Sequence, residues 1–200
     1  MTERAETTKQ QFIEVAKAHI QRKGIDNLLK YLEKTDFFTA PASTKYHSAY
    51  EGGLAEHSLK VFDNLCTLVS WKLNNGEDIT PETTETCAII ALFHDLSKIG
   101  QYEITMKNVK DANGKWTKEE QYIVKKDRKL LLGHAETSIY IIQRFITLTV
   151  EEVHAIRWHM GAYDSSAKGG DYDIGQALSK YPIALLTHIA DNLATNIDEE

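Results

Sequence analysis

A histidine directly followed by an aspartate, His94-Asp95, stands at the end of an apolar run that begins at Ala88. Such a run is typical of a helix that enters the protein interior, so the two polar side chains arrive at its buried end and need partners there. Imidazole and carboxylate groups are ligands of divalent metal ions, and an aspartate has two oxygens that can bridge two ions. A capped helix end explains a lone His-Asp pair equally well, so a metal site needs further candidate ligands elsewhere in the chain.

Four further candidates occupy comparable positions, each at a helix end or on a largely apolar helix. They are His57, His134, His159 and Asp191. Taken singly, each is more typical of a structural residue, because a histidine on an apolar face is usually a satisfied core residue. Burial of so many ionisable groups without partners would be costly, so together they indicate a divalent metal site. His154 has acidic neighbours and is expected to face solvent outside this site.

Helices must position these residues, and the hydrophobic periodicity predicts helices along most of the chain. The expected helical segments are residues 9–23, 25–35, 53–73, 81–93, 134–145, 149–159 and 182–197. The Asn-Gly pair at 113–114, flanked by apolar and aromatic residues, predicts a β-hairpin over 102–124. Residues 39–53 and 162–173 are expected to form loops that could line a pocket. The sequence therefore predicts a mainly α fold, a single helical bundle with one inserted hairpin.

The composition suits one domain with a real core, since 42% of the 200 residues are hydrophobic and 26% are charged. The net charge of −6 argues against general attraction to nucleic acid or an anionic membrane, although a local basic patch is possible. Cys66 and Cys87 lie in apolar helical patterns, which predicts reduced thiols and a cytoplasmic protein. The charged N-terminus and the lack of a run of roughly 18 apolar residues predict an unexported chain without a membrane span.

The order His, His-Asp, distant Asp resembles the HD-domain metal-dependent phosphohydrolases. Residues 52–58 (GGLAEHS) resemble the first histidine segment of that family, residues 94–98 (HDLSK) its signature, and residues 188–191 (HIAD) its closing aspartate. His134 and His159 fall where the two-metal members place extra histidines. The resemblance covers about residues 45–195. It implies an HD-type domain over 41–200, with residues 1–40 as N-terminal helices that pack on its core.

The resemblance also implies a ligand set and a reaction. The residues that would bind a first metal ion are His57, His94, Asp95 and Asp191. His134 and His159 would bind a second ion, with Asp95 as the bridge. The reaction of the family is attack of metal-activated water on phosphorus, and Lys98 would stabilise the negative charge that develops. Mn, Fe, Co, Ni, Zn and Mg ions are not distinguished by such ligands, and a solvated helix-end cation is the alternative for Lys98.

Several further residues are expected to act on the substrate. His47 is a candidate acid for the leaving group. The candidates for holding phosphate or base are Lys45, Tyr50, Arg157 and Lys168. A solvated loop without such a role is the alternative for residues 45–50.

The resemblance implies an enzyme that cleaves a phosphoester bond in a nucleotide or short oligonucleotide. Residues 45–54 and 132–134 are most similar to bacterial HD exoribonucleases that digest RNA from the 3′ end, so a 3′-5′ exonuclease on single-stranded RNA or DNA is the first alternative. Those enzymes carry an OB-type domain ahead of the HD domain. This chain offers about two helices there and is acidic, which favours a short substrate. A non-catalytic module that binds a nucleotide or a protein is the second alternative.

The chain lacks the Gly-Tyr-Pro motif of the cyclic-dinucleotide phosphodiesterases, since Lys180-Tyr181-Pro182 is a different sequence. We therefore make no prediction of that substrate, and the oligomeric state is left open.

Overall fold

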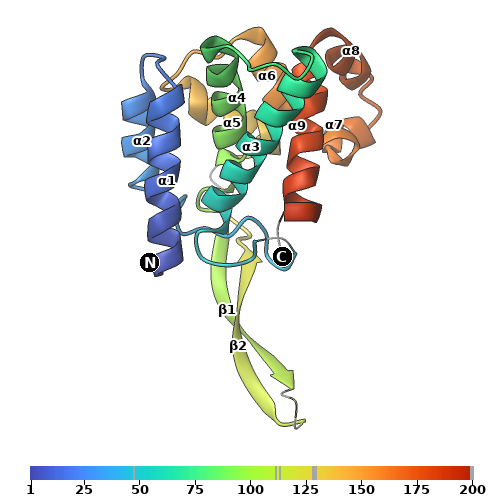
Figure 1. Ribbon diagram of the computed structural model, residues 1–200. Coiled ribbons are helices and arrows are strands. Elements are labelled where there is room, and N and C mark those ends of the chain that lie inside the picture. The colour runs from blue at the N-terminus through green and yellow to red at the C-terminus, as the bar shows by residue number, and fades with distance from the viewer. Residues whose placement is uncertain (47, 111, 113, 128–129, 199–200) are drawn as a thin grey trace.

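The computed structural model describes residues 1–46, 48–110, 112, 114–127 and 130–198 (Figure 1). The chain is mainly helical with one two-stranded antiparallel sheet, as the sequence predicts. The α-helices are α1 (Glu3–His19), α2 (Ile25–Leu32), α3 (Gly53–Leu73), α4 (Pro81–Phe93), α5 (His134–Gln143), α6 (Val150–Arg157), α7 (Ser165–Lys168), α8 (Asp173–Lys180) and α9 (Pro182–Leu193). The remaining elements are η1 (Leu96–Lys98), η2 (Gly161–Tyr163), the π-helical η3 (Ala194–Asp198), β1 (Tyr102–Lys110) and β2 (Trp116–Val124).

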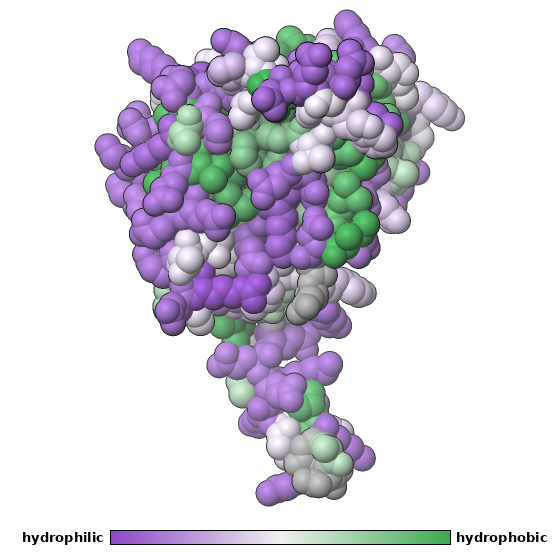
Figure 2. Space-filling view, in the orientation of Figure 1, coloured by the Kyte–Doolittle hydropathy of each residue, from purple (hydrophilic) through white to green (hydrophobic). Residues whose placement is uncertain are grey.

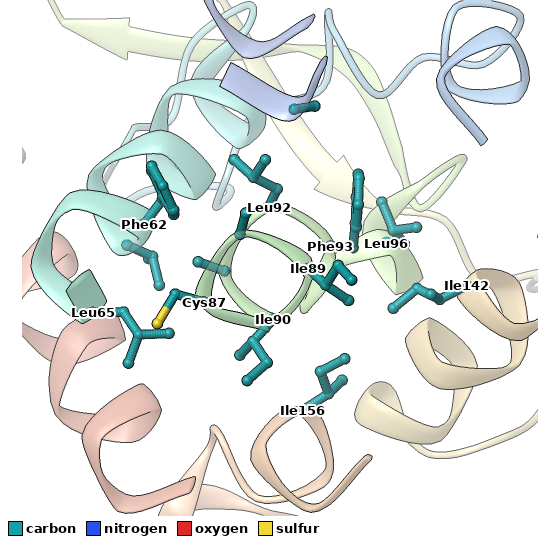
Figure 3. Packing of buried hydrophobic residues seen from close by; sticks show 14 of the residues in the cluster. Phe62, Leu65, Cys87, Ile89, Ile90, Leu92, Phe93, Leu96, Ile142 and Ile156 are labelled. Carbon is teal, nitrogen blue, oxygen red and sulfur yellow. The ribbon is translucent and has the colours of Figure 1, made fainter. Parts of the chain in front are cut away.

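Helix α4 lies at the centre of the core, and every residue from 87 to 93 is buried. Figure 3 looks along this helix and shows its side chains pointing outward in several directions. Phe62 and Leu65 of α3 lie on one side, and Ile142 of α5 and Ile156 of α6 lie on others. A helix that is apolar all round is typical of a core position. Whatever follows its last turn is therefore delivered into the interior.

The other helices pack around α4. Helix α3 contacts both α4 and α9, while α1 contacts α3 and α4. Phe12 of α1 and Leu28 of α2 belong to the same hydrophobic cluster as α4.

The division of the chain into two parts near residue 40 stays a prediction. Within the described residues, no helix has the length and hydrophobicity that a membrane span requires.

The start of α1 lies earlier than predicted, at Glu3 rather than at Lys9. The Thr2 side chain accepts a hydrogen bond from the backbone N–H of Ala5, which is a stabilising N-cap. Glu3 and Glu6 place negative charge at the positive end of the helix dipole. The prediction was wrong because it followed apolar spacing, whereas capping and charge begin this helix.

The end of α1 also differs, because the helix stops at His19 rather than at Lys23. Just beyond it, the backbone N–H groups of Gln21 and Arg22 donate to a carboxylate oxygen of Glu85, at 2.7 and 2.8 Å. Glu85 belongs to α4, far along the chain. A long-range side chain therefore satisfies backbone donors at this end, which the local sequence does not reveal.

The second predicted loop, residues 162–173, is partly helical. It contains α7, and α8 begins at its last residue. The Asp164 side chain caps α7 by accepting from the backbone N–H groups of Ser166 and Ala167, at 2.8 and 3.4 Å. A helix of one turn has no hydrophobic periodicity, so the prediction of an irregular loop was wrong for this part. The other loop, over 39–53, has no helix or strand among its described residues before Gly53, where α3 begins.

The predicted hairpin is present, and Figure 1 shows β1 and β2 projecting from the helical body as one arm. Tyr102 pairs with Val124 near the body, and Lys110 pairs with Trp116 near the tip. Trp116 is 65% exposed. Figure 2 shows a mostly hydrophilic arm with small hydrophobic patches. The arm is thus held by its own strand pairing and its base rather than by burial in the core.

An ion pair joins the segment after α1 to α6. The Arg22 guanidinium donates to Glu152 at 2.6 Å, and the Glu152 side chain is fully buried. The same carboxylate accepts the backbone N–H of Thr149 at 2.8 Å and completes a capping box at the start of α6. Glu152 therefore stabilises a helix end and neutralises a half-buried cation.

We expect Glu152→Ala to lower the free energy of unfolding by about 2 kcal/mol, because it removes the capping box and one partner of a buried pair. Arg22 keeps its contact with Glu85, which limits the loss. Urea unfolding followed by circular dichroism measures the change. Glu151→Ala is the matched control, since Glu151 is exposed on the same turn. Equal stability of the two variants would contradict this role for Glu152.

Candidate metal centre

The six predicted ligands come together beside the end of α4. They are His57 of α3, His94 and Asp95 after α4, His134 at the first position of α5, His159 after α6, and Asp191 of α9. The four imidazole rings form a continuous row in the order 57, 94, 159, 134. Successive ring centroids lie 5.4, 4.9 and 5.3 Å apart. Residues distant in the sequence therefore present nitrogen and oxygen donors to one small volume.

Adjacent residues can face one site here because α4 ends between them. His94 keeps helical backbone angles, whereas Asp95 leaves the helix with φ −107° and ψ 20°. On a continuing helix the two side chains would diverge by about 100°. Gly100 turns the chain after η1 with φ +68°. The break in α4 thus aims both side chains of the pair at the same partners.

Hydrogen bonds fix the tautomers of two buried histidines. Nδ1 of His94 donates to the carbonyl oxygen of Ala91 at 2.8 Å, and Nδ1 of His159 donates to that of Ile156 at 2.7 Å. A carbonyl only accepts, so each Nδ1 carries a proton and a neutral ring keeps its lone pair on Nε2. Both Nε2 atoms are buried and have no hydrogen-bond partner among the described residues. Such atoms fit a metal, because a ligand histidine typically anchors its other nitrogen in this way.

The Asp95 carboxylate is the centre of the cluster and is 3% exposed. One oxygen lies 2.6 Å from Nε2 of His134 and 3.6 Å from Nε2 of His159. The other lies 2.7 Å from the Lys98 ammonium and 3.5 Å from Nε2 of His94. Burial alone would raise the pKa of Asp95, but the Lys98 ammonium and the neighbouring imidazoles of His94 and His134 outweigh burial and hold that pKa well below its usual range. The carboxylate is therefore ionised and ready to ligate a cation.

Asp191 is held in a similar way from the opposite side. Its carboxylate lies 3.1 Å from Nε2 of His57. Burial would raise the pKa of Asp191, but the hydrogen bond with His57 and the nearby imidazoles lower it strongly. Two ionised carboxylates thus flank the row of imidazoles.

Three overlapping groups of donors could each hold a metal ion, with ligand atoms within 4.8 Å of one another. The groups are His57, His94, Asp95; His94, His159, Asp191; and Asp95, His134, His159. The third group contains the three residues that the family resemblance implies for a second ion. Neutral imidazole with carboxylate suits divalent transition metals. The donor set therefore fits a metal centre, while the identity and number of its ions stay proposals.

A cavity of about 330 Å³ opens beside the cluster and reaches Asp95, Lys98, His134, His159 and Asp191. The Lys98 side chain is 14% exposed. Burial would lower the pKa of Lys98, but Asp95 and its other acidic neighbours raise it, so the ammonium stays charged. A buried cation and the ligand cluster thus face the same space.

The cavity wall also contains residues that the sequence analysis left out of the site. They are Met160, Tyr163, His188, Asn192, Thr195 and Asn196. His188 comes three residues before Asp191, and Asn192, Thr195 and Asn196 follow it along α9 and η3. Spacing along one helix face was therefore a usable signal. Nδ1 of His188 donates to the carbonyl oxygen of His159 at 2.6 Å. This ring lies against Gly161, where a Cβ atom would be 2.6 Å away.

The predicted substrate contacts lie elsewhere. In the described part of the chain, the lining of this cavity includes none of Lys45, Tyr50, Arg157 and Lys168. Tyr50 accepts a hydrogen bond from Arg4 at 2.8 Å, and Lys45 is exposed. His47 lies outside the described residues. The substrate roles of these residues stay predictions.

Arg157 has a clear structural contact set. It forms ion pairs with Asp164 at 3.0 Å and with Glu136 at 2.9 Å, and it stacks on the Trp158 ring. These contacts tie α5 and the cap of α7 to the end of α6, next to His159. Lys168 lies 5.6 Å from the ring of Tyr163, which lines the cavity.

The fold and the site define a helical bundle with a buried His/Asp cluster at its centre. The model of the HD domain family matches residues 54–196, which is more than half of the chain, so the chain belongs to the HD-domain family. This family implies metal-dependent phosphohydrolase chemistry. Comparison with curated proteins and with solved structures gave no match.

We expect the protein to bind a divalent transition metal and to gain thermal stability from it, because a ligand that binds the folded state stabilises it. His159→Gln should weaken Mn²⁺ binding by about tenfold or more, as it removes a donor from two of the three groups. Titration calorimetry measures the affinity. His154→Gln is the control, since His154 bonds to its own helix and lies outside the cluster. Unaltered binding by the His159 variant would count against this metal centre.

Proposed function

We propose that the protein is a metal-dependent phosphohydrolase that cleaves a phosphoester bond in a nucleotide or short oligonucleotide. The observation that carries the proposal is the pair of buried Nε2 atoms of His94 and His159, which have no hydrogen bond among the described residues and converge on ionised Asp95. Membership of the HD-domain family supports the same chemistry.

The chain's own residues would bind and orient the reacting groups. Bound metal ions would supply an activated water nucleophile and would neutralise phosphoryl oxygens. Asp95 shares donor groups with four imidazoles and can therefore contribute to more than one metal position. Lys98 faces the cavity, where its ammonium can stabilise negative charge on a nonbridging phosphoryl oxygen. Water exclusion by the surrounding core strengthens that interaction.

The lining of the metal-centre cavity favours a short substrate. Lys98 is the single lysine or arginine among the described residues that line it. Asn192, Thr195 and Asn196 contribute neutral amide and hydroxyl groups. Such a wall suits one phosphoryl group next to a neutral polar group such as a sugar, since a run of phosphates would need more cations.

A 3′-5′ exonuclease on single-stranded RNA or DNA is the second candidate. Exposed Trp116 and Lys110 near the tip of the arm are the kind of residues that hold single strands by stacking and charge. Stepwise shortening of a 3′-tailed RNA or DNA oligomer would support it. Failure to shorten any such strand would exclude the exonuclease.

A non-catalytic binding module is the third candidate. It would use the metal for structure alone. Multiple turnover of any phosphoester that stops on chelation and returns with metal would exclude it.

We expect turnover of at least one member of a panel of mononucleotides, cyclic nucleotides and short RNA and DNA oligomers in the presence of Mn²⁺. Asp95→Ala should abolish it, because that carboxylate joins two of the donor groups. Lys98→Gln should lower kcat about a hundredfold, because it removes stabilisation of developing charge. Phosphate and nucleoside release measure both effects.

Asp63→Ala and Lys60→Gln are matched controls on α3, away from the metal-centre cavity. Both should keep the rate of the unaltered protein. Full turnover in Asp95→Ala would refute the proposed function, and an unchanged kcat in Lys98→Gln would refute the role of that ammonium.

A further inference from the structure

A second cavity, of about 540 Å³, shares His134 with the cavity of the metal centre. The two nitrogens of His134 point to different neighbours. Nε2 lies 2.6 Å from Asp95, and Nδ1 lies 2.8 Å from the hydroxyl of Ser97, which lines the second cavity. The imidazole is therefore a common wall between the two spaces. We call the second space the Tyr31 cavity, after an aromatic residue of its lining.

The Tyr31 cavity combines an aromatic ring with two cations. The Arg144 guanidinium lies 5.8 Å from the centre of the Tyr31 ring, and Lys125 extends from the end of β2. Among the described residues, neither Arg144 nor Lys125 forms an ion pair with a carboxylate. Aromatic faces bind nucleobases by stacking, and free cations bind phosphate oxygens. The pattern is therefore that of a nucleotide site.

The described lining also includes two carboxylates. Asp36 accepts the backbone N–H of Gly100 at 2.8 Å through one oxygen, and Asp127 is an exposed residue. Carboxylate oxygens suit the hydroxyl groups of a ribose or the amino groups of a base. The cavity is also large enough for a small ligand, since such sites typically measure about 300–1,000 Å³.

We propose that the Tyr31 cavity binds the nucleoside unit on one side of the scissile phosphate together with a second phosphate of that unit, which Arg144 and Lys125 would hold, while the metal-centre cavity takes the scissile phosphate and the group on its other side. The substrate is then a phosphodiester of dinucleotide size that passes over His134. This inference rests on the proposed function and narrows its substrate class. In the reaction, an oxygen–phosphorus bond forms from water, the ester bond breaks, and the leaving oxygen gains a proton. The products are an alcohol and a phosphomonoester.

The first experiment compares two diesters on the metal-loaded full chain. One is 5′-phosphoadenylyl-(3′→5′)-adenosine, a dinucleotide whose terminal phosphate can reach Arg144 and Lys125, and the other is bis(p-nitrophenyl) phosphate, which lacks nucleosides and a second phosphate. Arg144→Gln and Lys125→Gln should each raise the KM for the dinucleotide about tenfold, because each removes a charged contact. The KM for the nitrophenyl diester should not change. Lys126→Gln is the matched control, since Lys126 neighbours Lys125 but is exposed outside the lining.

Two results would overturn the inference while the proposed function stands. One is an unchanged KM for the dinucleotide in both variants. The other is an equal rise for both diesters, which would trace the effect to the metal centre. Stimulation of nitrophenyl diester hydrolysis by the dinucleotide would show an effector site and would also overturn it.

A binding measurement tests the Tyr31 cavity as a nucleotide site separately from the proposed hydrolase function. Calorimetry with 5′-phosphoadenylyl-(3′→5′)-adenosine in the presence of a chelator should give binding that Arg144→Gln weakens about tenfold and Lys126→Gln leaves intact. Binding of this kind without hydrolysis of any phosphoester would refute the proposed function but keep the cavity as a nucleotide site. Equal affinity of all variants would refute the cavity assignment.

Discussion

The ionised Asp95 carboxylate, held inside an apolar core, is the constraint on which the rest of the structure depends. Removing such a charge from water costs several kcal/mol even after relaxation. The Lys98 ammonium at 2.7 Å and the His134 ring at 2.6 Å offset part of this cost. Three histidine nitrogens around the same carboxylate favour its charge further once a cation joins them. A surface position would need none of these partners and would give a weaker field.

The buried position of the Asp95 carboxylate explains why α4, which ends just before it, is apolar on every side. A helix that is buried on every side needs no polar face, so its apolar residues are spent on packing against α3, α5 and α6. Its end must then satisfy the polar groups that it carries inward. Ala91 does so for His94, since its carbonyl receives the Nδ1 proton. Packing and chemistry are thus two results of the same short stretch of sequence, and a metal ion that completes the donor set would also stabilise the fold.

The grouping of the six His and Asp side chains was predictable because each one stands at a helix end or on a largely apolar helix, while their role as metal ligands stays a prediction. The ends of α3 and α4 follow from local signals, such as Thr80 as N-cap and Pro81 behind it. The end of α1 does not, because Glu85 sets it from another helix. Helical spacing along α9 places His188 near Asp191, but the contact of His188 with the carbonyl of His159 joins α9 to the end of α6, and spacing within one segment does not encode that contact.

The distribution of charge explains why recognition here depends on placement rather than on an overall field. The chain carries a net charge of −6, so a polyanion gains little from long-range attraction. Among the described residues, the cations of the two cavities are few, with Lys98 beside Asp95 and Arg144 beside Tyr31. Under the proposed function, such a pair of sites favours a ligand whose phosphate and ring reach both cations at once. A longer strand would gain little from a chain of this net charge, so specificity would come from these few contacts.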